Sequence, residues 1–361
     1  MIEKMLEERN LPELMRMNDG SDVTRENWQD RRRELLEILA HHEYGKMPSP
    51  WGETTGKVIS KNYHACGLAE YRSVEITFPT PDGSAFTFPA EITVPRSATA
   101  ENPAPVFVYI SFGTNRYSCV EEIVEQGVIL AEFCMNSVSW DRKNSYEEKL
   151  DVHVFDNGKR KDDDWGKIGM WAFAASRLLD YLLTFDYVDR TRVGVIGHSR
   201  LGKTALWAGA NDERFTHVYS NDSGCSGAAI TRKKVGETFP VIANVFDYWF
   251  CENMQKISAD VETSENTCFD QHFLLAACAP RKVYVASAQL DTWADPTSEY
   301  LCCHAASPAW EIFGGAGFIA PDRLPEAWDR FADGNIGYHL RPGEHFLSRH
   351  DWKRYIDFIK R

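Results

Sequence analysis

RVGVIGHSRLGKTALW, residues 192–207, places an apolar run directly before a tight turn and a segment of helical composition. The run at residues 193–196 is typical of a buried parallel strand. A strand, a tight turn carrying a serine, and a helix form the pattern of a nucleophile elbow, which lifts the Ser199 hydroxyl above the end of a sheet. The backbone N–H of Arg200 would then lie at a helix N-terminus, where it can stabilise an oxyanion. The stretch therefore predicts acyl-transfer chemistry on an α/β fold.

The motif departs from the usual G-x-S-x-G pattern. Its second glycine, Gly202, comes three residues after Ser199, and Leu201 stands where the usual motif has glycine. A serine before a helix can also be a simple N-cap. The flanking strand, together with Arg200 and Lys203, favours a nucleophile over a cap.

Length and charge limit the classes of protein to consider. With 361 residues, of which 43% are hydrophobic, the chain is expected to form one elaborated domain over 1–361, with residues 1–50 as a helical capping segment. A formal net charge of −13 argues against nucleic-acid and anionic membrane partners. No stretch resembles a signal peptide or approaches the ~18 apolar residues of a membrane span. We expect a monomer, and the compartment stays open.

The nine cysteines form an odd set without a C-x-x-C pair. An odd number cannot pair completely within one chain, and several of these cysteines lie in apolar runs. Free, mostly buried thiols in a reducing compartment are therefore expected, and a zinc site is not. We predict no metal and no organic cofactor.

Patterns on either side of the elbow predict the remaining layers. Alternating apolar residues over 56–95, with a turn at residues 81–83, indicate antiparallel edge strands. Apolar runs at residues 106–110 and 127–132 indicate a parallel core. Residues 166–185 carry one apolar stripe that is expected to face the sheet. Residues 111–115, after the first parallel strand, lie where related folds place a second oxyanion donor, although a plain turn fits equally well.

Two polar segments, residues 31–33 and 135–165, lie outside the predicted core elements. The three arginines at residues 31–33 of an N-terminal helix are expected to be a solvated face. The long polar segment at residues 135–165 contains Trp140 and Trp165, which favours an ordered rim with a sugar-stacking surface.

Ser199 needs a base, which this fold places on the loop after the last strand. His345 is the histidine in that position, whereas His350 falls inside the predicted last helix. His198, next to the serine in sequence, should point away from it and support the elbow. We predict His345 as the base.

The third member is a carboxylate that orients the imidazole and stabilises its cation. Asp222, in NDSGCSG, and Asp291, in DTWADP, end successive predicted strands. Each could also cap the turn that follows it. The sequence leaves the choice between them open, and a shared role is physically possible.

The form G-[CH]-S-R-x-G-K around Ser199 resembles the glucuronoyl esterases of carbohydrate esterase family 15. The resemblance runs from about Leu11 to the C-terminus, and its most specific pieces are GHSRLGK, SNDSGCSG, FDQH, DTWADP and PGEH. It implies an α/β-hydrolase fold, a three-layer αβα sandwich with a central, mostly parallel sheet. It also implies a Ser-His-Asp acyl-enzyme mechanism on esters of glucuronic or 4-O-methylglucuronic acid, as in lignin–glucuronoxylan cross-links. The lack of a cysteine pairing pattern fits the bacterial branch.

The resemblance also implies roles for further residues. Asp222 matches the acidic position of the family's E-S-G-x-G-G segment, with Asp one methylene shorter than Glu. Arg200 is expected to assist the oxyanion, Lys203 and Glu237 to bind ring hydroxyls, and Trp293 to stack on the sugar. Two alternatives remain: another carboxylesterase such as an acetyl-xylan esterase, and a non-catalytic carbohydrate-binding relative.

Overall fold

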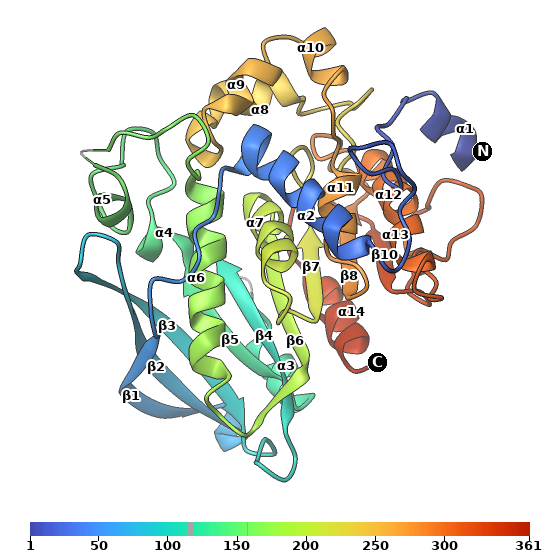
Figure 1. Cartoon of the computed structure of the whole chain (residues 1–361). Helices are drawn as coiled ribbons and strands as arrows, with labels where there is room; N and C mark the ends of the chain where they lie inside the picture. The colour runs from blue at the N-terminus through green and yellow to red at the C-terminus, as the bar shows by residue number, and fades with distance from the viewer. Residues whose placement is uncertain (114–117, 157) are drawn as a thin grey trace.

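The computed structural model describes residues 1–113, 118–156 and 158–361. Within these residues the centre of the molecule is a ten-stranded sheet with the order β1-β2-β3-β5-β4-β6-β7-β8-β10-β9 (Figure 1). The strands are β1 (Thr55–His64), β2 (Ala69–Pro79), β3 (Ala85–Pro95), β4 (Ala104–Ser111), β5 (Ile129–Cys134), β6 (Val188–His198), β7 (His217–Asn221), β8 (Lys282–Ala288), β9 (Arg330–Phe331) and β10 (Ile336–Arg341).

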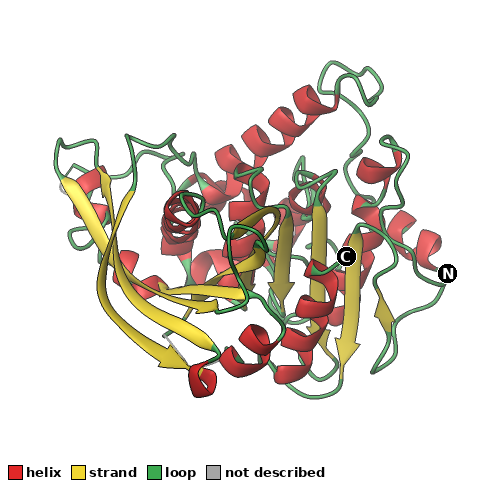
Figure 2. Ribbon diagram, turned by 90° about the horizontal axis from the view of Figure 1, so that it is seen from below, coloured by secondary structure: helices red, strands yellow, loops and turns green. Residues whose placement is uncertain are grey.

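The sheet is parallel in its middle and antiparallel at both edges. β5, β4, β6, β7, β8 and β10 pair in parallel, and the apolar runs of the sequence predicted β4, β5 and β6 among them. β1, β2 and β3 form the predicted antiparallel edge and join the core where β3 pairs with β5. In the predicted turn between β2 and β3, the Gly83 N–H donates to the Thr80 carbonyl. These long edge strands curve away from the flatter core in Figure 2.

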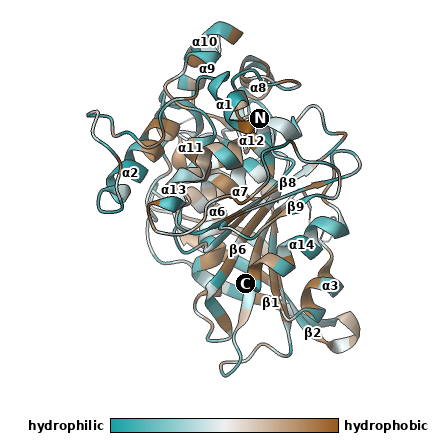
Figure 3. Ribbon diagram, turned by 90° about the vertical axis from the view of Figure 1, so that its right-hand side faces the viewer, coloured by the Kyte–Doolittle hydropathy of each residue, from teal (hydrophilic) through white to brown (hydrophobic). Residues whose placement is uncertain are grey.

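Helices cover both faces of the sheet, which confirms the predicted three-layer αβα sandwich. α6 (Lys167–Leu182) and α7 (Arg200–Asn211) lie on one face, with α2 (Trp28–Leu39) packed outside them (Figure 1). α3 (Val120–Glu125) and α14 (Arg349–Ile359) pack on the other face. The parallel strands between them are mostly hydrophobic (Figure 3).

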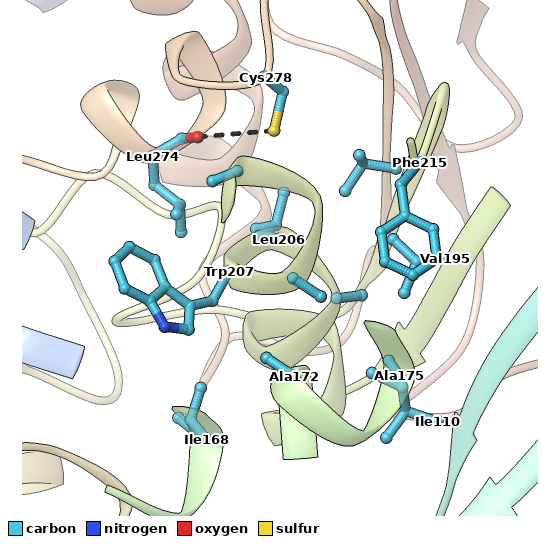
Figure 4. Packing of buried hydrophobic residues seen from close by; sticks show 14 of the residues in the cluster. Ile110, Ile168, Ala172, Ala175, Val195, Leu206, Trp207, Phe215, Leu274 and Cys278 are labelled. Carbon is cyan, nitrogen blue, oxygen red and sulfur yellow. Dashed lines mark hydrogen bonds between the residues drawn. The ribbon is translucent and has the colours of Figure 1, made fainter. Parts of the chain in front are cut away.

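α6 differs from its prediction in how completely it is buried. All of its residues except Asp180 are buried, so the helix has no solvated side. Figure 4 shows the inner side of α6, where Ala172 lies beside α7 and Ala175 lies near Ile110 of β4. The predicted apolar stripe is buried, and the opposite side is covered as well, because Trp51 packs on Phe173 and Asp151 pairs with Lys167.

The expectation for residues 31–33 is wrong for two of the three arginines. Arg31 and Arg32 are buried, whereas Arg33 is exposed. Arg32 Nε donates to the Ala277 carbonyl at 2.8 Å, and its Nη2 donates to the Ala210 carbonyl at 2.5 Å. Both acceptors lie at helix ends, where carbonyls lack partners within the helix. Arg32 therefore binds the N-terminal helix to the domain.

The segment at residues 135–165 contains two short helices, α4 (Met135–Val138) and α5 (Asp151–Val154). Trp140 is half-buried, but Trp165 is buried against Trp51 and Phe173. Trp165 is therefore part of the core and not of a sugar-binding rim.

The C-terminal half of the chain contains several short helices. Pro308 separates two helices, because proline cannot donate the backbone hydrogen bond that would continue the first helix.

All nine cysteines are free, as predicted, and five of them are buried. In the described residues no helix is both long and apolar enough to cross a bilayer. The other helices are α1 (Ile2–Glu7), α8 (Phe239–Val245), α9 (Asn253–Ile257), α10 (Val261–Glu265), α11 (His272–Ala276), α12 (Pro296–Ala306) and α13 (Pro308–Glu311), with shorter turns at Ala40–Tyr44, Ala65–Gly67 and Asp247–Trp249.

Candidate active site

Ser199 lies in the sharp turn between β6 and α7. Its backbone has φ 59° and ψ −128°, a conformation that residues other than glycine rarely adopt. The Ser199 N–H donates to the Asn221 carbonyl at 2.8 Å, and the Ser199 carbonyl accepts from Gly202 at 2.8 Å. Strain of this kind persists where the surrounding structure enforces it, commonly at functional sites. α7 begins directly at Arg200, so the Arg200 N–H lies in the first turn of the helix.

Two close approaches explain the unusual spacing of glycines in this turn. A Cβ atom on Gly197 would lie 1.8 Å from the Leu201 carbonyl oxygen, and one on Gly202 would lie 3.0 Å from Ser223 Cβ. Leu201 itself is fully buried. The second glycine is therefore needed at Gly202, three residues after Ser199, where α7 approaches the end of β7. The position that holds glycine in the usual motif is occupied by Leu201, which packs in the core.

All the predicted site residues line one pocket of about 320 Å³. It lies beyond the carboxyl ends of the parallel strands, where ligands of open α/β sheets bind. The pocket also contains two aromatic residues, Phe246 and Trp249, that the sequence analysis missed. Its lining comprises Ser199, Arg200, Lys203, Asp222, Ser223, Gly224, Glu237, Phe246, Trp249, Asp291, Trp293, Ala294 and His345.

His345 is hydrogen-bonded to Asp291. Its Nδ1 donates to Asp291 Oδ2 at 2.6 Å, with the imidazole partly exposed and the carboxylate buried. Burial raises the pKa of Asp291, but the hydrogen bond and charge of His345 outweigh it and leave this pKa below its ordinary value. The acid is therefore ionised, and it fixes His345 in the tautomer whose Nε2 can accept a proton.

Asp222 has other partners. Its Oδ2 accepts from Arg341 Nη2 at 3.0 Å and from the Phe346 N–H at 3.4 Å. Burial, reinforced by the charge of Glu299, raises the pKa of Asp222 well above its ordinary value, with Arg341 opposing the shift. The two candidate acids thus differ: Asp291 holds His345, and Asp222 holds Arg341.

His198 packs beside the predicted base. Its ring centroid lies 4.5 Å from that of His345, and its Nδ1 donates to Asn221 Oδ1 at 2.7 Å. Burial, and then the charge of His345, lower the pKa of His198 to about 3. His198 is therefore a neutral supporting residue.

Arg200 is held by a group that the sequence analysis did not connect to the site. Its Nη1 pairs with Asp141 Oδ2, and its guanidinium lies 4.8 Å from the ring centroid of Trp249. Asp141 Oδ1 also accepts from Trp249 Nε1 at 2.6 Å and from the Tyr248 hydroxyl at 3.3 Å. The aromatic run NVFDYWF at residues 244–250 was the one available signal, but nothing in it indicates Asp141.

Lys203 and Glu237 form a buried ion pair in the pocket. Lys203 Nζ lies 3.8 Å from Glu237 Oε2, and it also donates to the Ser223 carbonyl. The Glu237 N–H donates to the Trp293 carbonyl at 3.0 Å. Trp293 is 56% exposed, so it offers an open apolar face beside the two polar groups.

Two further expectations concern oxyanion and metal binding. Ser111, Phe112 and Gly113 of the predicted second oxyanion loop are described, but Thr114 and Asn115 lie outside the described residues.

Among the residues that the structure covers, one group of three possible metal ligands has ligand atoms within 4.8 Å of one another: Asp222, Asp291 and His345. Because His345 Nδ1 already donates to Asp291, this arrangement favours proton transfer over metal binding.

Comparisons with known proteins agree with the geometry. A family model described as "Glucuronyl esterase, fungi" matches residues 78–314. "Carbohydrate esterase MZ0003", from an unknown prokaryotic organism, is 33% identical over 96% of this chain and 88% of its own length. The solved structure of a glucuronoyl esterase from Solibacter usitatus is 34% identical, covers 97% of both chains and superposes with a TM-score of 0.87.

A more distant curated relative, the 4-O-methyl-glucuronoyl methylesterase of Hypocrea jecorina, is 27% identical over 84% of this chain and 62% of its own length. The family match, the full-length similarity and the sheet topology confirm the resemblance found in the sequence. The chain belongs to the glucuronoyl esterases of carbohydrate esterase family 15, and it is a carboxylic ester hydrolase with the α/β-hydrolase fold.

Proposed function

We propose that the protein hydrolyses esters of glucuronic or 4-O-methylglucuronic acid, as in lignin–glucuronoxylan cross-links, with Ser199 as nucleophile, His345 as base and Asp291 as acid. The observation that carries this proposal is the 2.6 Å hydrogen bond between His345 Nδ1 and Asp291 Oδ2, in the same pocket as the strained Ser199. A nucleophile, an imidazole base and an orienting carboxylate are the parts that acyl transfer requires.

The reaction takes place in two halves. Ser199 Oγ attacks the ester carbonyl while its proton passes to His345 Nε2, and the resulting oxyanion is stabilised by the Arg200 N–H at the start of α7. The imidazolium, stabilised by Asp291, then gives its proton to the departing alcohol. Water attacks the acyl-enzyme with His345 again as base, and the uronic acid leaves as Ser199 regains its proton.

Asp291 is favoured over Asp222 as the acid for two reasons. Asp291 alone is hydrogen-bonded to His345, and its lowered pKa keeps it ionised when the imidazolium forms. Asp222 is instead hydrogen-bonded to Arg341, and its raised pKa makes it a weaker counter-ion for an imidazolium.

The polar floor of the pocket supports a uronate as the acyl group. The buried pair of Lys203 and Glu237 supplies a donor and an acceptor for ring hydroxyls, and the exposed face of Trp293 can stack on the sugar. A small acetyl group would leave this buried pair without a ligand. The name of the Hypocrea jecorina relative points to the same class of ester.

The test compares benzyl glucuronate with 4-nitrophenyl acetate. We expect the wild-type enzyme to have a much larger kcat/KM for the uronate ester. Lys203→Met should raise KM for the uronate ester and leave acetate hydrolysis nearly unchanged, because acetate has no hydroxyl for Lys203 to bind. A preference for acetate would contradict the proposed substrate and favour an acetyl esterase. No turnover of either ester would favour a carbohydrate-binding protein.

A further inference from the structure

The loop at residues 342–348, between β10 and α14, carries His345. The His345 side chain is 43% exposed, so few core contacts hold it in place. The position of its imidazole therefore depends on how this loop is fixed. The buried groups beneath the loop show what fixes it.

Arg341, the last residue of β10, is 5% exposed and lies beneath the loop. Its Nη1 donates to the Pro342 carbonyl at 3.2 Å, and its Nη2 donates to the Phe346 carbonyl. Pro342 begins the loop, and Phe346 directly follows His345. One guanidinium thus binds the backbone on both sides of the predicted base.

Two carboxylates from different elements bind this guanidinium. Asp222, at the end of β7, accepts from Arg341 Nη2 at 3.0 Å. Asp351, in the first turn of α14, accepts from Arg341 Nε at 3.1 Å. The Asp222 and Asp351 side chains are fully buried, so solvent does not compete for these contacts.

Each carboxylate is itself fixed to the loop or its flanks. Asp222 also accepts from the Phe346 N–H at 3.4 Å. Asp351 accepts from the Ser348 N–H at 2.6 Å in a capping box and from His339 Nε2 at 2.8 Å. The network therefore joins β7, β10, α14 and both sides of His345.

We propose that Arg341 is a positioning residue that, bridged between Asp222 and Asp351, holds the His345 loop so that the imidazole meets both Asp291 and Ser199. This inference rests on the proposed role of His345 as base. It also gives Asp222 a function, which is to act through Arg341 and not as the acid of the triad. The planar guanidinium suits this role because it can direct several donors at fixed angles, which a lysine ammonium cannot.

The test uses Arg341→Met and Arg341→Lys, with Arg32→Met as the matched control. Arg32 is also a buried arginine that binds two backbone carbonyls, but it joins α2 to α7 and to the end of α11, and it does not line the pocket. For each variant we would measure kcat and KM on benzyl glucuronate, thermal stability, and the low-field proton resonance of His345 Nδ1–H, assigned by its loss in Asp291→Asn.

Arg341→Met is expected to lower kcat by about 10–100-fold, because small displacements of a catalytic group have effects of this size. KM should stay close to the wild-type value, and the low-field resonance should broaden or disappear. Arg32→Met should lower thermal stability but keep both kcat and the resonance. Wild-type kcat and resonance in Arg341→Met would overturn the proposal, as would losses no larger than those in Arg32→Met.

Arg341→Lys covers the case in which Arg341→Met does not fold. It keeps a positive charge between the two carboxylates but cannot reach all four acceptors, so a folded protein with lowered kcat and a weakened resonance is expected. A lysine variant with wild-type kcat and resonance would then overturn the proposal. A wild-type enzyme that does not hydrolyse the uronate ester would instead contradict the proposed function, whereas the resonance would still report on Arg341.

Discussion

At the scale of single residues, the two candidates for the triad acid differ in their hydrogen-bond partners. Asp291 Oδ2 lies 2.6 Å from His345 Nδ1, whereas Asp222 is paired with Arg341. Asp291→Asn should lower kcat by about 10³–10⁴-fold, because an amide in place of the carboxylate favours the wrong imidazole tautomer. Asp222→Asn should have a smaller effect, since its side chain can still accept from Arg341.

Rates of benzyl glucuronate hydrolysis for the two variants, each compared with the wild type, measure this difference. The assignment would be contradicted by a larger loss in Asp222→Asn than in Asp291→Asn.

At the scale of the β6–α7 element, the elbow depends more strongly on Gly197 than on Gly202. A Cβ at position 197 would lie 1.8 Å from a backbone oxygen, which cannot move without displacing α7. Gly197→Ala should therefore abolish activity or folding. Gly202→Ala meets Ser223 Cβ at 3.0 Å, so a small shift can relieve it, at a cost in stability of about 1–3 kcal/mol.

Thermal unfolding and kcat of the two alanine variants test this ranking. A Gly197→Ala variant as stable and active as Gly202→Ala would contradict the ranking and show that the elbow tolerates displacement of α7.

A second prediction concerns the segment that carries Asp141. Lys167 at the start of α6 pairs with Asp151 at 2.5 Å, and both side chains are fully buried. Lys167→Met should destabilise the fold by about 3–5 kcal/mol, because it leaves a buried carboxylate without its partner. The double variant Lys167→Met/Asp151→Leu should recover much of this loss.

Urea unfolding of the wild type and both variants gives these differences. A double variant less stable than Lys167→Met would mean that the ion pair is not the origin of the loss.

The strands, the central helices and the elbow were predictable because their apolar patterns are local. The contacts of Arg32 were not, since its acceptor at Ala277 lies 245 residues away. Similarly, Asp141 reaches Arg200 from a polar segment without any periodicity. The choice between Asp222 and Asp291 depends on Arg341, which the sequence presents only as the first residue of the loop after the last strand.

At the scale of the whole molecule, fully and partly buried histidines govern how stability depends on pH. Burial lowers the pKa of five histidines from about 6.5 to about 3 or 4. Between these pH values the unfolded chain binds protons that the folded chain does not, so stability should fall as pH falls below 6.5. These residues are His198, His217, His272, His304 and His350.

Two buried glutamates act in the opposite direction. Burial raises the pKa of Glu43 and Glu299 from 4.5 to about 7, so in this window the folded chain binds protons that the unfolded chain does not. Between pH 7 and 4.5 the two glutamates therefore offset part of the stability loss that the histidines cause. Below pH 4.5 this offset stops growing, because the glutamates are then protonated in both the folded and the unfolded chain. Between pH 6.5 and 4.5 stability should therefore decline less steeply than the five histidines alone would produce.

His217→Phe tests the histidine contribution directly. The new ring keeps the contacts with Tyr219 and Phe358 but cannot bind a proton. Between pH 4 and 6 the slope of unfolding free energy against pH should decrease by about 1.4 kcal/mol per pH unit, the contribution of one titrating group. Urea midpoints at several pH values measure it, and an unchanged slope would contradict the buried neutral state of His217.

The central claim is that Ser199 is the nucleophile of a uronate esterase. The most direct measurement is benzyl glucuronate hydrolysis by the wild type and Ser199→Ala, with circular dichroism to confirm that both are folded. We predict rapid turnover by the wild type and a loss of about 10⁵-fold or more in the variant. A folded Ser199→Ala that keeps a large fraction of the wild-type rate would contradict the account.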